Sequence, residues 1–353
     1  MLSTRRFWLG LIITVGLLFL FLWKVDFEET GRELQEANYA YFLPAVLVYF
    51  ASLGFRSLRW HFLLLHLKSV PPWRLYSVVA IGYLANNILP IRLGELVRAH
   101  SLGEREGINK ASALSTIAVE RMVDGLTLIL FIAVAWPFLP WTDVLRTDTG
   151  DINTLWIILS IFVALVFVAG FLAMFLFATS PALAHRLAHL LAAVSPKSFR
   201  PRMESLVYLL LDGLGALRSP RKILLIAVLS APVSLLEAAV YHIIAVSFEL
   251  NLPFQVILLV TATSNLATAI PSSIGGIGPF EVVAKSTLVA FGTSGEAAAA
   301  YSFFVHIITL WLPVNVLGLF FLGKENLTLS QLARTRRIDM SSREASVGKG
   351  PDT

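Results

Sequence analysis

The stretch TSNLATAIPSSIGGIGPFEVVAK, residues 263–285, begins as apolar membrane sequence and then breaks. Proline removes a backbone donor and glycine destabilises a helix interior, so its breaking residues cannot share one continuous helix. They are Pro271, Gly275, Gly276, Gly278 and Pro279. The apolar run 254–270 therefore ends here, and 279–291 forms a shorter second leg. Because such a leg rises only about 17–20 Å, the stretch predicts a re-entrant hairpin.

A second broken stretch, NNILPIRLGELVR, occupies residues 86–98. The apolar run 75–91 stops at Pro90, and 93–103 is again too short to span the membrane. We expect Gly94 to allow close approach of the two legs. The polar residues Asn87, Arg92, Glu95 and Arg98 would then lie where a headgroup enters from one side of the membrane.

Composition places the chain in the membrane. Of 353 residues, 56% are hydrophobic and only 14% are charged, against about 25% in soluble domains. The absence of cysteine excludes disulfides, zinc–thiolate sites and thiol nucleophiles, and the net charge of +5 is not a nucleic-acid signature. Six runs are long enough to span, at 7–23, 41–58, 113–136, 153–178, 223–248 and 298–322.

The distribution of basic residues predicts orientation. With a cytoplasmic N-terminus, 23 of the 28 lysines and arginines lie in cytoplasmic segments, and only Lys24, Arg32 and Arg146 lie outside. This bias follows the positive-inside rule. It predicts cytoplasmic termini, a first hairpin that opens to the cytoplasm and a second that opens to the outside.

The two halves of the chain resemble each other at an offset of 181 residues, since 271 − 90 = 181. Three spans lie between the hairpins, so the second unit would be inverted relative to the first. We therefore expect an all-α polytopic membrane protein with about six spanning helices and two re-entrant broken-helix hairpins in an inverted repeat, an arrangement typical of secondary transporters. Chance alignment of apolar helices is the alternative.

The predicted organisation is a single transmembrane domain, 1–322, followed by a polar, basic and disordered cytoplasmic tail, 323–353. Within the domain we expect repeat one at about 41–136, a connecting helix at 153–178, a cytoplasmic amphipathic segment at 180–222, and repeat two at about 223–322.

Charges inside the spans are candidates for the functional site. Glu120, Arg121 and Asp124 share one turn of the run 113–136, and each charge at bilayer depth costs at least about 2.5–3.5 kcal/mol. Snorkelling at the cytoplasmic end is the alternative to an interior site, but acidic side chains are too short to reach far. An interior site is therefore favoured.

Glu237 is a lone acid within 223–248 and needs a partner or a proton. Arg56 and Arg59 are candidate partners, and the repeat offset places Arg56 opposite it, because 56 + 181 = 237. We therefore expect a cross-repeat Arg56–Glu237 pair.

In the second hairpin, Glu281 and Lys285 share a face of the return leg and are also placed to pair with each other. His242 and His306 are expected to be core residues rather than metal ligands. The P-loop, HExxH and GxSxG signatures are absent. We expect no enzyme activity, no cofactor and no metal.

Three motifs in order resemble one known family. They are Asn87, Pro90, Arg92, Gly94, Glu95 and Arg98; then Glu120, Arg121 and Asp124; then Pro271, Gly275, Gly276, Gly278 and Glu281. This set resembles the flippase-like transmembrane region of lysylphosphatidylglycerol synthases, over about residues 40–322. The resemblance implies a bacterial or archaeal inner-membrane protein that moves a lipid headgroup between leaflets. We expect the translocating part alone, without the aminoacyl transferase domain.

The resulting hypothesis is a lipid translocase that is not driven by ATP. Its headgroup-binding candidates are Asn87, Arg92, Glu95, Arg98, Glu120, Arg121, Asp124, Glu237, Glu281 and Lys285, with Arg56 and Arg59 as charge partners. Its partners would be membrane lipids, either anionic phospholipids or lipid-linked sugars, and an envelope-lipid synthase or glycosyltransferase, but not nucleic acid. A small-molecule secondary transporter and a non-transporting partner of such an enzyme are the alternatives.

Overall fold

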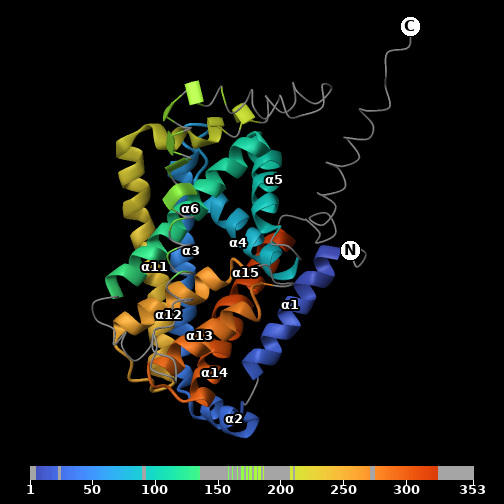
Figure 1. Cartoon of the computed structure of the whole chain (residues 1–353). Coiled ribbons are helices and arrows are strands. Elements are labelled where there is room, and N and C mark those ends of the chain that lie inside the picture. The colour runs from blue at the N-terminus through green and yellow to red at the C-terminus, as the bar shows by residue number, and fades with distance from the viewer. Residues whose placement is uncertain are drawn as a thin grey trace.

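The computed structural model describes residues 5–22, 25–89, 93–135, 207–209, 211–270 and 275–324, with scattered positions between 158 and 186. Helices are the regular elements of this described part (Figure 1). They are α1 (Arg5–Leu22), α2 (Phe27–Glu36), η1 (Tyr39–Tyr41), α3 (Phe42–Leu64), α4 (Pro72–Ile88), α5 (Gly94–Glu106), α6 (Lys110–Ala135), η4 (Leu214–Arg218), α11 (Pro220–Ser247), α12 (Phe254–Ala267), α13 (Pro279–Ala290), α14 (Gly295–Phe303), η5 (Phe304–Trp311) and α15 (Leu312–Lys324).

Three continuous helical segments are long and apolar enough to cross a membrane. These are Tyr39–Leu64, Pro220–Ser247 and Gly295–Lys324, found among the described residues. They coincide with the predicted spans 41–58, 223–248 and 298–322. The predicted spans 7–23 and 113–136 are helices as well, α1 and α6. The span 153–178 and most of the amphipathic segment 180–222 lie outside the described residues, so six spans stay a prediction.

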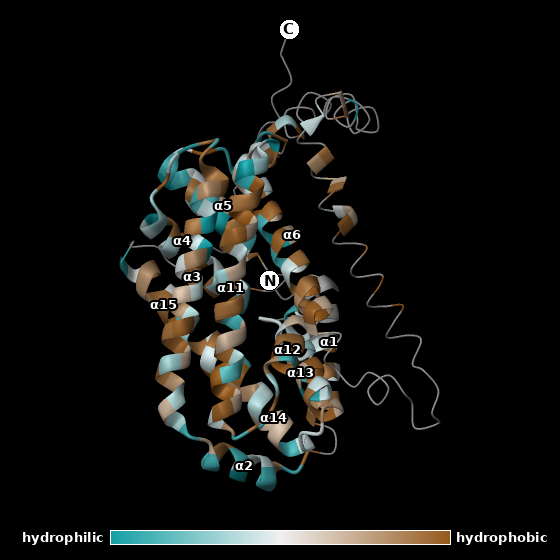
Figure 2. Cartoon of the chain, turned by 90° about the vertical axis from the view of Figure 1, so that its left-hand side faces the viewer, coloured by the Kyte–Doolittle hydropathy of each residue, from teal (hydrophilic) through white to brown (hydrophobic). Residues whose placement is uncertain are grey.

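Both broken stretches form a pair of helices with a short second leg. The legs have 17 and 13 residues in α4 and α5, and 14 and 12 in α12 and α13. Figures 1 and 2 place α5 towards one end of the molecule and α12 and α13 towards the other. The breaking residues Pro90 and Pro271, and the candidate Arg92, lie outside the described residues.

The helices of each half pack against helices of the other half, a pattern called exchange packing below. α3 packs on α11 along its length, α4 packs on α15, and α12 packs on α6. The first leg of each hairpin thus packs against the final helix of the other half. Gly318 makes one of these contacts close, because a Cβ there would lie 2.6 Å from Leu84 Cβ. The two halves are therefore interlocked.

One helix was not expected from the sequence. The acidic segment after the first helix, which the distribution of basic residues places outside through Lys24 and Arg32, forms α2. Its N-cap is Asp26, whose Oδ1 accepts hydrogen bonds from the backbone of Glu28 and Glu29 at 2.9 and 3.1 Å. This cap satisfies donors that a helix start leaves unpaired. An acidic composition with a good cap can therefore form a short helix where composition alone suggests a loop.

Many large apolar side chains are exposed on the bundle, and Figure 2 colours most of the long helices in the brown of hydrophobic residues. Exposed examples on the spanning helices are Leu43, Leu47, Val228, Leu235, Val316 and Phe320. Inside, by contrast, Arg56, Arg59, Arg98, Glu120 and Glu281 are all less than 9% exposed. A surface of this kind suits lipid, whereas charges at such depth must meet protein partners.

Candidate functional site

Four helices bring their charged residues to one interior cluster, here called the ionic cluster. It contains Arg56 and Arg59 from α3, Arg98 from α5, Glu120, Arg121 and Asp124 from α6, and Glu237 from α11. Arg56 and Arg59 lie three residues apart and so share one face of α3. The cluster therefore joins the first hairpin to the core helices of both halves.

Arg98 holds Glu120 at the hairpin end of the ionic cluster. Its Nη1 and Nη2 donate to the two carboxylate oxygens at 3.1 and 2.8 Å. The guanidinium also lies over the Trp60 ring, 4.2 Å from its centre, and Trp60 Nε1 donates to Thr116 Oγ1 at 3.0 Å. Bidentate geometry and the aromatic face both fix a guanidinium more firmly than a point charge. Arg98 is thus a positioned structural ion as well as a headgroup candidate.

Arg56 joins the two halves of the chain. Its Nη1 donates to Asp124 Oδ2 at 2.9 Å and its Nη2 donates to Glu237 Oε2 at 2.8 Å. The cross-repeat Arg56–Glu237 pair expected from the sequence is therefore present. Arg59 lies beside it, with Nη1 at 2.7 Å from Asp124 Oδ1 and at 2.8 Å from the Ser230 hydroxyl. The shared acceptor Asp124 makes these pairs a network rather than separate bridges.

The ionic cluster carries more positive charge than negative charge. Its four arginines face three carboxylates. The Nε donors of Arg59, Arg98 and Arg121 are buried and have no hydrogen-bond acceptor. Arg121 contacts Glu120 at 2.6 Å and Asp124 at 3.2 Å, yet 35% of its side chain stays exposed. An unpartnered buried donor is costly, so the cluster is suited to receive one further anion.

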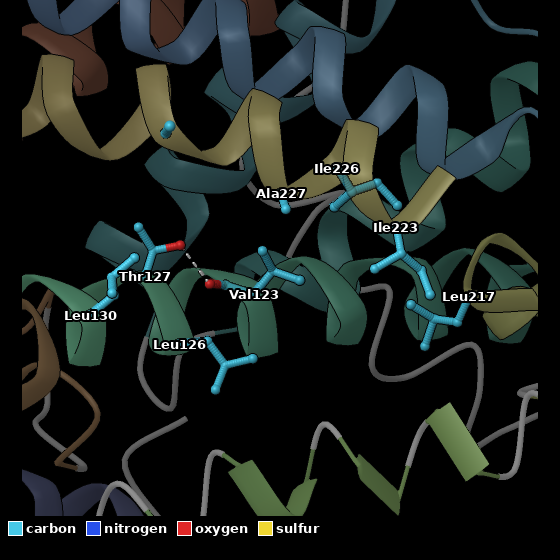
Figure 3. A pocket seen from close by; sticks show the side chains of 9 residues that line it. Val123, Leu126, Thr127, Leu130, Leu217, Ile223, Ile226 and Ala227 are labelled. Carbon is cyan, nitrogen blue, oxygen red and sulfur yellow. Dashed lines mark hydrogen bonds between the residues drawn. The ribbon is translucent and has the colours of Figure 1, made fainter. Parts of the chain in front are cut away.

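An apolar groove of about 230 Å³ lies beside the ionic cluster, between α6 and α11 (Figure 3). Its lining residues are Val123, Leu126, Thr127, Leu130, Leu217, Ile223, Ile226, Ala227 and Ala231. Thr127 donates its hydroxyl hydrogen bond to the Val123 carbonyl at 2.9 Å, so its polar atom is already satisfied. Ser230 links the two regions, because it contacts Arg59 and donates to the Ile226 carbonyl at 2.7 Å.

The tip of the first hairpin is held by an asparagine. Asn86 Oδ1 accepts from the Gly94 backbone at 2.7 Å, and its Nδ2 donates to Glu95 Oε1 at 3.1 Å. A Cβ at position 94 would overlap the Gly82 carbonyl oxygen. Gly94 therefore allows the close approach that the sequence suggested, and Glu95 lies at the tip rather than in the ionic cluster.

The two hairpin tips meet where η5 ends and α15 begins. Asn87 Nδ2 donates to Asn315 Oδ1 at 3.0 Å. Gly275, with φ of +53°, lies so near that a Cβ there would be 2.8 Å from Trp311 Nε1 and 3.4 Å from Asn87 Oδ1. Gly275 is the residue 181 positions after Gly94, since 94 + 181 = 275. A glycine thus sits at each tip, at the offset that the sequence comparison of the two halves uses.

Glu281 and Lys285 do not pair, contrary to one interpretation of their spacing. Glu281 accepts from the Gly278 backbone at 2.7 Å and lies 2.6 Å from His306 Nδ1. Lys285 Nζ instead donates to the Phe21 carbonyl of α1 at 3.0 Å. The carboxylate of Glu281 already has partners, the backbone N–H of Gly278 at the start of the helix and the ring of His306. Lys285 has an acceptor of its own in the backbone of α1.

The residues predicted for the site thus lie in three separate places in the structure. Arg98, Glu120, Arg121, Asp124 and Glu237 come together, whereas Asn87 and Glu95 lie at the first tip and Glu281 and Lys285 in the second hairpin. Residues that the sequence did not single out for the site are Asn86, Ser230, Trp311 and Asn315, and His306 was assigned only to the core. Doubled asparagines at a break were a usable signal for Asn86. Within the described part, no group of three or more metal-ligating side chains is found.

Apolar outer faces, spanning helices and an interior ionic cluster define a helical multi-pass membrane protein. The chain belongs to the family described as the lysylphosphatidylglycerol synthase TM region, which it matches over residues 7–316. The resemblance noted in the sequence is therefore confirmed.

Curated relatives include archaeal membrane proteins. The chain is 25% identical over 303 residues to a UPF0104 membrane protein of Methanothermobacter thermautotrophicus, covering 82% of this chain and 87% of that one. It is 24% identical over 338 residues to a UPF0104 membrane protein of Pyrococcus horikoshii, covering 92% and 98%. A 120-residue stretch, 34% of this chain, is 31% identical to 19% of the glycosyltransferase AglD of Haloferax volcanii. No solved structure matches the chain.

Proposed function

We propose that the protein is a lipid translocase that binds the anionic headgroup of a membrane lipid at the ionic cluster. The proposal rests on the excess of positive charge in this cluster, where Arg121 is partly exposed and three arginine Nε donors have no acceptor. One phosphate monoanion would balance four arginines against three carboxylates and supply the missing acceptors. Pairing with an anion stabilises a buried arginine strongly, because water cannot reach the buried charge to solvate it.

The adjoining groove favours a lipid over a soluble anion. A ligand that uses both regions must be anionic at one end and apolar at the other. The α6 turn containing Arg121 and Asp124 is followed directly by the groove residues Thr127 and Leu130. An acyl chain fits an apolar groove of this size, and each buried CH₂ contributes about 0.8 kcal/mol.

An inverted repeat would give the headgroup access from both sides of the membrane. The exchange packing of α4 on α15 and of α12 on α6 supports such a repeat. So does the pairing of Arg56 with Glu237, 181 residues apart. In this proposal the hairpins open alternately towards the two sides, around a site near the membrane midplane.

The test is lipid movement in vesicles that contain the reconstituted full chain. Fluorescent NBD-labelled phosphatidylglycerol and phosphatidylcholine are placed in one leaflet, and the fraction accessible to dithionite is followed in time. We expect faster movement of the anionic probe than in protein-free vesicles. Arg121→Gln should slow it about tenfold or more, one headgroup ion pair being worth at least about 1.4 kcal/mol. Arg74→Gln, at an exposed ion pair, is the matched control.

A groove-filling variant separates lipid from soluble substrate. Ala227→Phe should slow lipid movement and leave any stabilisation by inorganic phosphate in a thermal-shift assay unchanged. Vesicles in which no headgroup moves faster than without protein contradict the proposal. Stabilisation by soluble anions without lipid movement favours a small-molecule transporter instead.

A second candidate is a membrane partner of a glycosyltransferase, favoured by the stretch shared with AglD. A protein that binds such an enzyme without transporting lipid would use its outer surface for binding. Its ionic cluster would not be required for this function. Glu120→Gln and Arg121→Gln should then leave function in cells intact, provided that the protein level is unchanged. Loss of function in these variants argues against this candidate.

A further inference from the structure

We infer that Glu281 and His306 form a proton-binding site that couples lipid movement to a proton gradient. The inference rests on the proposed function and adds an energy source to it. Glu281 lies on α13 of the second hairpin and His306 lies on η5, and both are outside the ionic cluster. Glu281 is 2% exposed and His306 is 6% exposed, and Glu281 Oε1 lies 2.6 Å from His306 Nδ1.

The chemistry of its partner distinguishes Glu281 from the acids of the ionic cluster. Glu120 is held by Arg98, and both Asp124 and Glu237 are held by Arg56. Arginine does not lose its proton in proteins, so those acids have permanent counter-charges. Among the described residues, the one side-chain ion partner of Glu281 is a histidine, a side chain that exists in both a neutral and a charged form. The charge of this pair can therefore change.

The proton balance of the site is simple. With a carboxylate and a neutral imidazole, the pair carries one negative charge. A single proton from water on one side makes it neutral overall, whether as carboxylate with imidazolium or as carboxylic acid with imidazole. Release of that proton to the other side restores the negative charge. A buried net charge is costly at bilayer depth, so the two states favour different surroundings.

The pair is connected to the moving parts that the proposed function requires. Glu281 Oε2 accepts from the backbone of Gly278, which has φ of +99° and lies in the hairpin break. His306 belongs to η5, an eight-residue π-helix, and its ring stacks on Phe280 with centroids 4.1 Å apart. π-Helical turns occur often at functional sites. A proton on Glu281 removes negative charge from the oxygens that hold the break.

The same π-helix reaches the place where the hairpins meet. Trp311 at its end faces Gly275 of the second tip, and Asn315 one turn later contacts Asn87 of the first. Proton binding at Glu281 and His306 is therefore placed to shift both tips together.

Other titratable groups nearby have different partners. On the helices that pack against α13 and η5, these groups are Arg5 and Arg6 on α1, Tyr49, Arg56, Arg59 and His61 on α3, Arg221, Lys222, Glu237, Tyr241 and His242 on α11, Lys285 on α13, Glu296 and Tyr301 on α14, and Lys324 on α15. Lys285 donates to the Phe21 carbonyl and Tyr301 donates to the Tyr241 carbonyl. α12 has none.

The first experiment measures proton binding directly on the purified full chain, without any lipid probe. Infrared difference spectra are recorded across about pH 5 to 8, the range in which histidine titrates. We expect a carboxylic acid C=O band to rise or an imidazolium band to titrate in the wild type. The part of the change that comes from this pair should be missing in Glu281→Gln and in His306→Gln, while the bands of the other six histidines remain. Glu296→Gln, the control on the adjacent helix, should keep the whole wild-type change.

The second experiment uses vesicles with NBD-labelled phosphatidylglycerol and an imposed pH gradient. The wild type should move the probe at least about threefold faster with the gradient than without it, whereas Glu281→Gln should move it at one gradient-independent rate. If Glu281→Gln does not fold, His306→Gln and the wild-type spectra decide. Unchanged gradient dependence in a folded variant, or wild-type spectra that match those of a folded Glu281→Gln or His306→Gln variant, overturns the inference. Absence of any probe movement in the wild type refutes the proposed function instead.

Discussion

At the scale of single residues, the ionic cluster is held together by carboxylates that each contact more than one arginine. Glu120 is in contact with Arg98, Arg121 and Arg59, at 2.8, 2.6 and 3.6 Å. Asp124 likewise takes Arg56 and Arg59. Removing one partner from a buried ion pair is much more costly than the pair is worth, because a charge is left without compensation.

Arg98→Leu should therefore lower the free energy of unfolding by about 3–5 kcal/mol. Its loss leaves Glu120, which is 0% exposed, short of its bidentate partner. Arg74→Leu is the matched control, because that arginine pairs with Glu106 while 63% exposed and should cost about 1 kcal/mol or less. Unfolding of both variants by SDS in mixed micelles measures the difference. Equal costs would contradict a structural role for Arg98.

The Arg56–Glu237 pair is tested by a double-mutant cycle. Arg56→Gln leaves Glu237 unpaired, so adding Glu237→Gln should recover about 0.5–3 kcal/mol of the lost stability. Reversing both charges should not rescue the protein, because a glutamate at position 56 would face Asp124, which Arg56 also binds. Additive effects of the two neutral substitutions in the same micelle assay would show that the pair is not coupled.

At the scale of elements, the two hairpins depend on close backbone contacts. Gly94 packs against the Gly82 carbonyl within the first hairpin, and Gly275 packs against Trp311 in the second. Neither contact leaves room for a side chain. Among the described residues, the hairpins are thus held close by glycines that have no side chain at these contacts.

Gly94→Ala should separate α4 from α5 and lower the melting temperature, at a cost of about 1–3 kcal/mol or more. The control is Gly54→Ala in α3, where no atom lies within 4 Å of the added Cβ. There alanine should be neutral or stabilise by up to about 1 kcal/mol, because glycine is a poor helix former. Melting followed by circular dichroism compares the two. A neutral Gly94→Ala would disprove the close approach.

At the scale of the whole molecule, the chain reverses the pattern of a soluble protein. Its outside is apolar and its interior holds the ions. In the exchange packing, the first leg of each hairpin packs against the final helix of the other half. That arrangement is what the proposed translocation requires.

The orientation of the whole chain in the membrane follows from its basic residues and can be tested by labelling. Because the natural chain has no cysteine, single cysteines can be introduced at Glu28 and Arg74, whose side chains are 79% and 63% exposed. A membrane-impermeant maleimide added to intact cells should label position 28 and not position 74. Labelling at 74 should appear after the membrane is permeabilised. Labelling of both positions in intact cells would refute the orientation derived from the basic residues.

The sequence by itself determined that this is a helical membrane protein, where its apolar runs break, and that Arg56 and Glu237 belong together. These features follow from composition, from proline and glycine, and from an offset that can be counted along the chain. Only the tertiary structure decided that Glu281 meets His306 rather than Lys285, and that Lys285 meets α1. Helical spacing shows which residues share a face, but the partner on that face comes from another helix, brought there by packing.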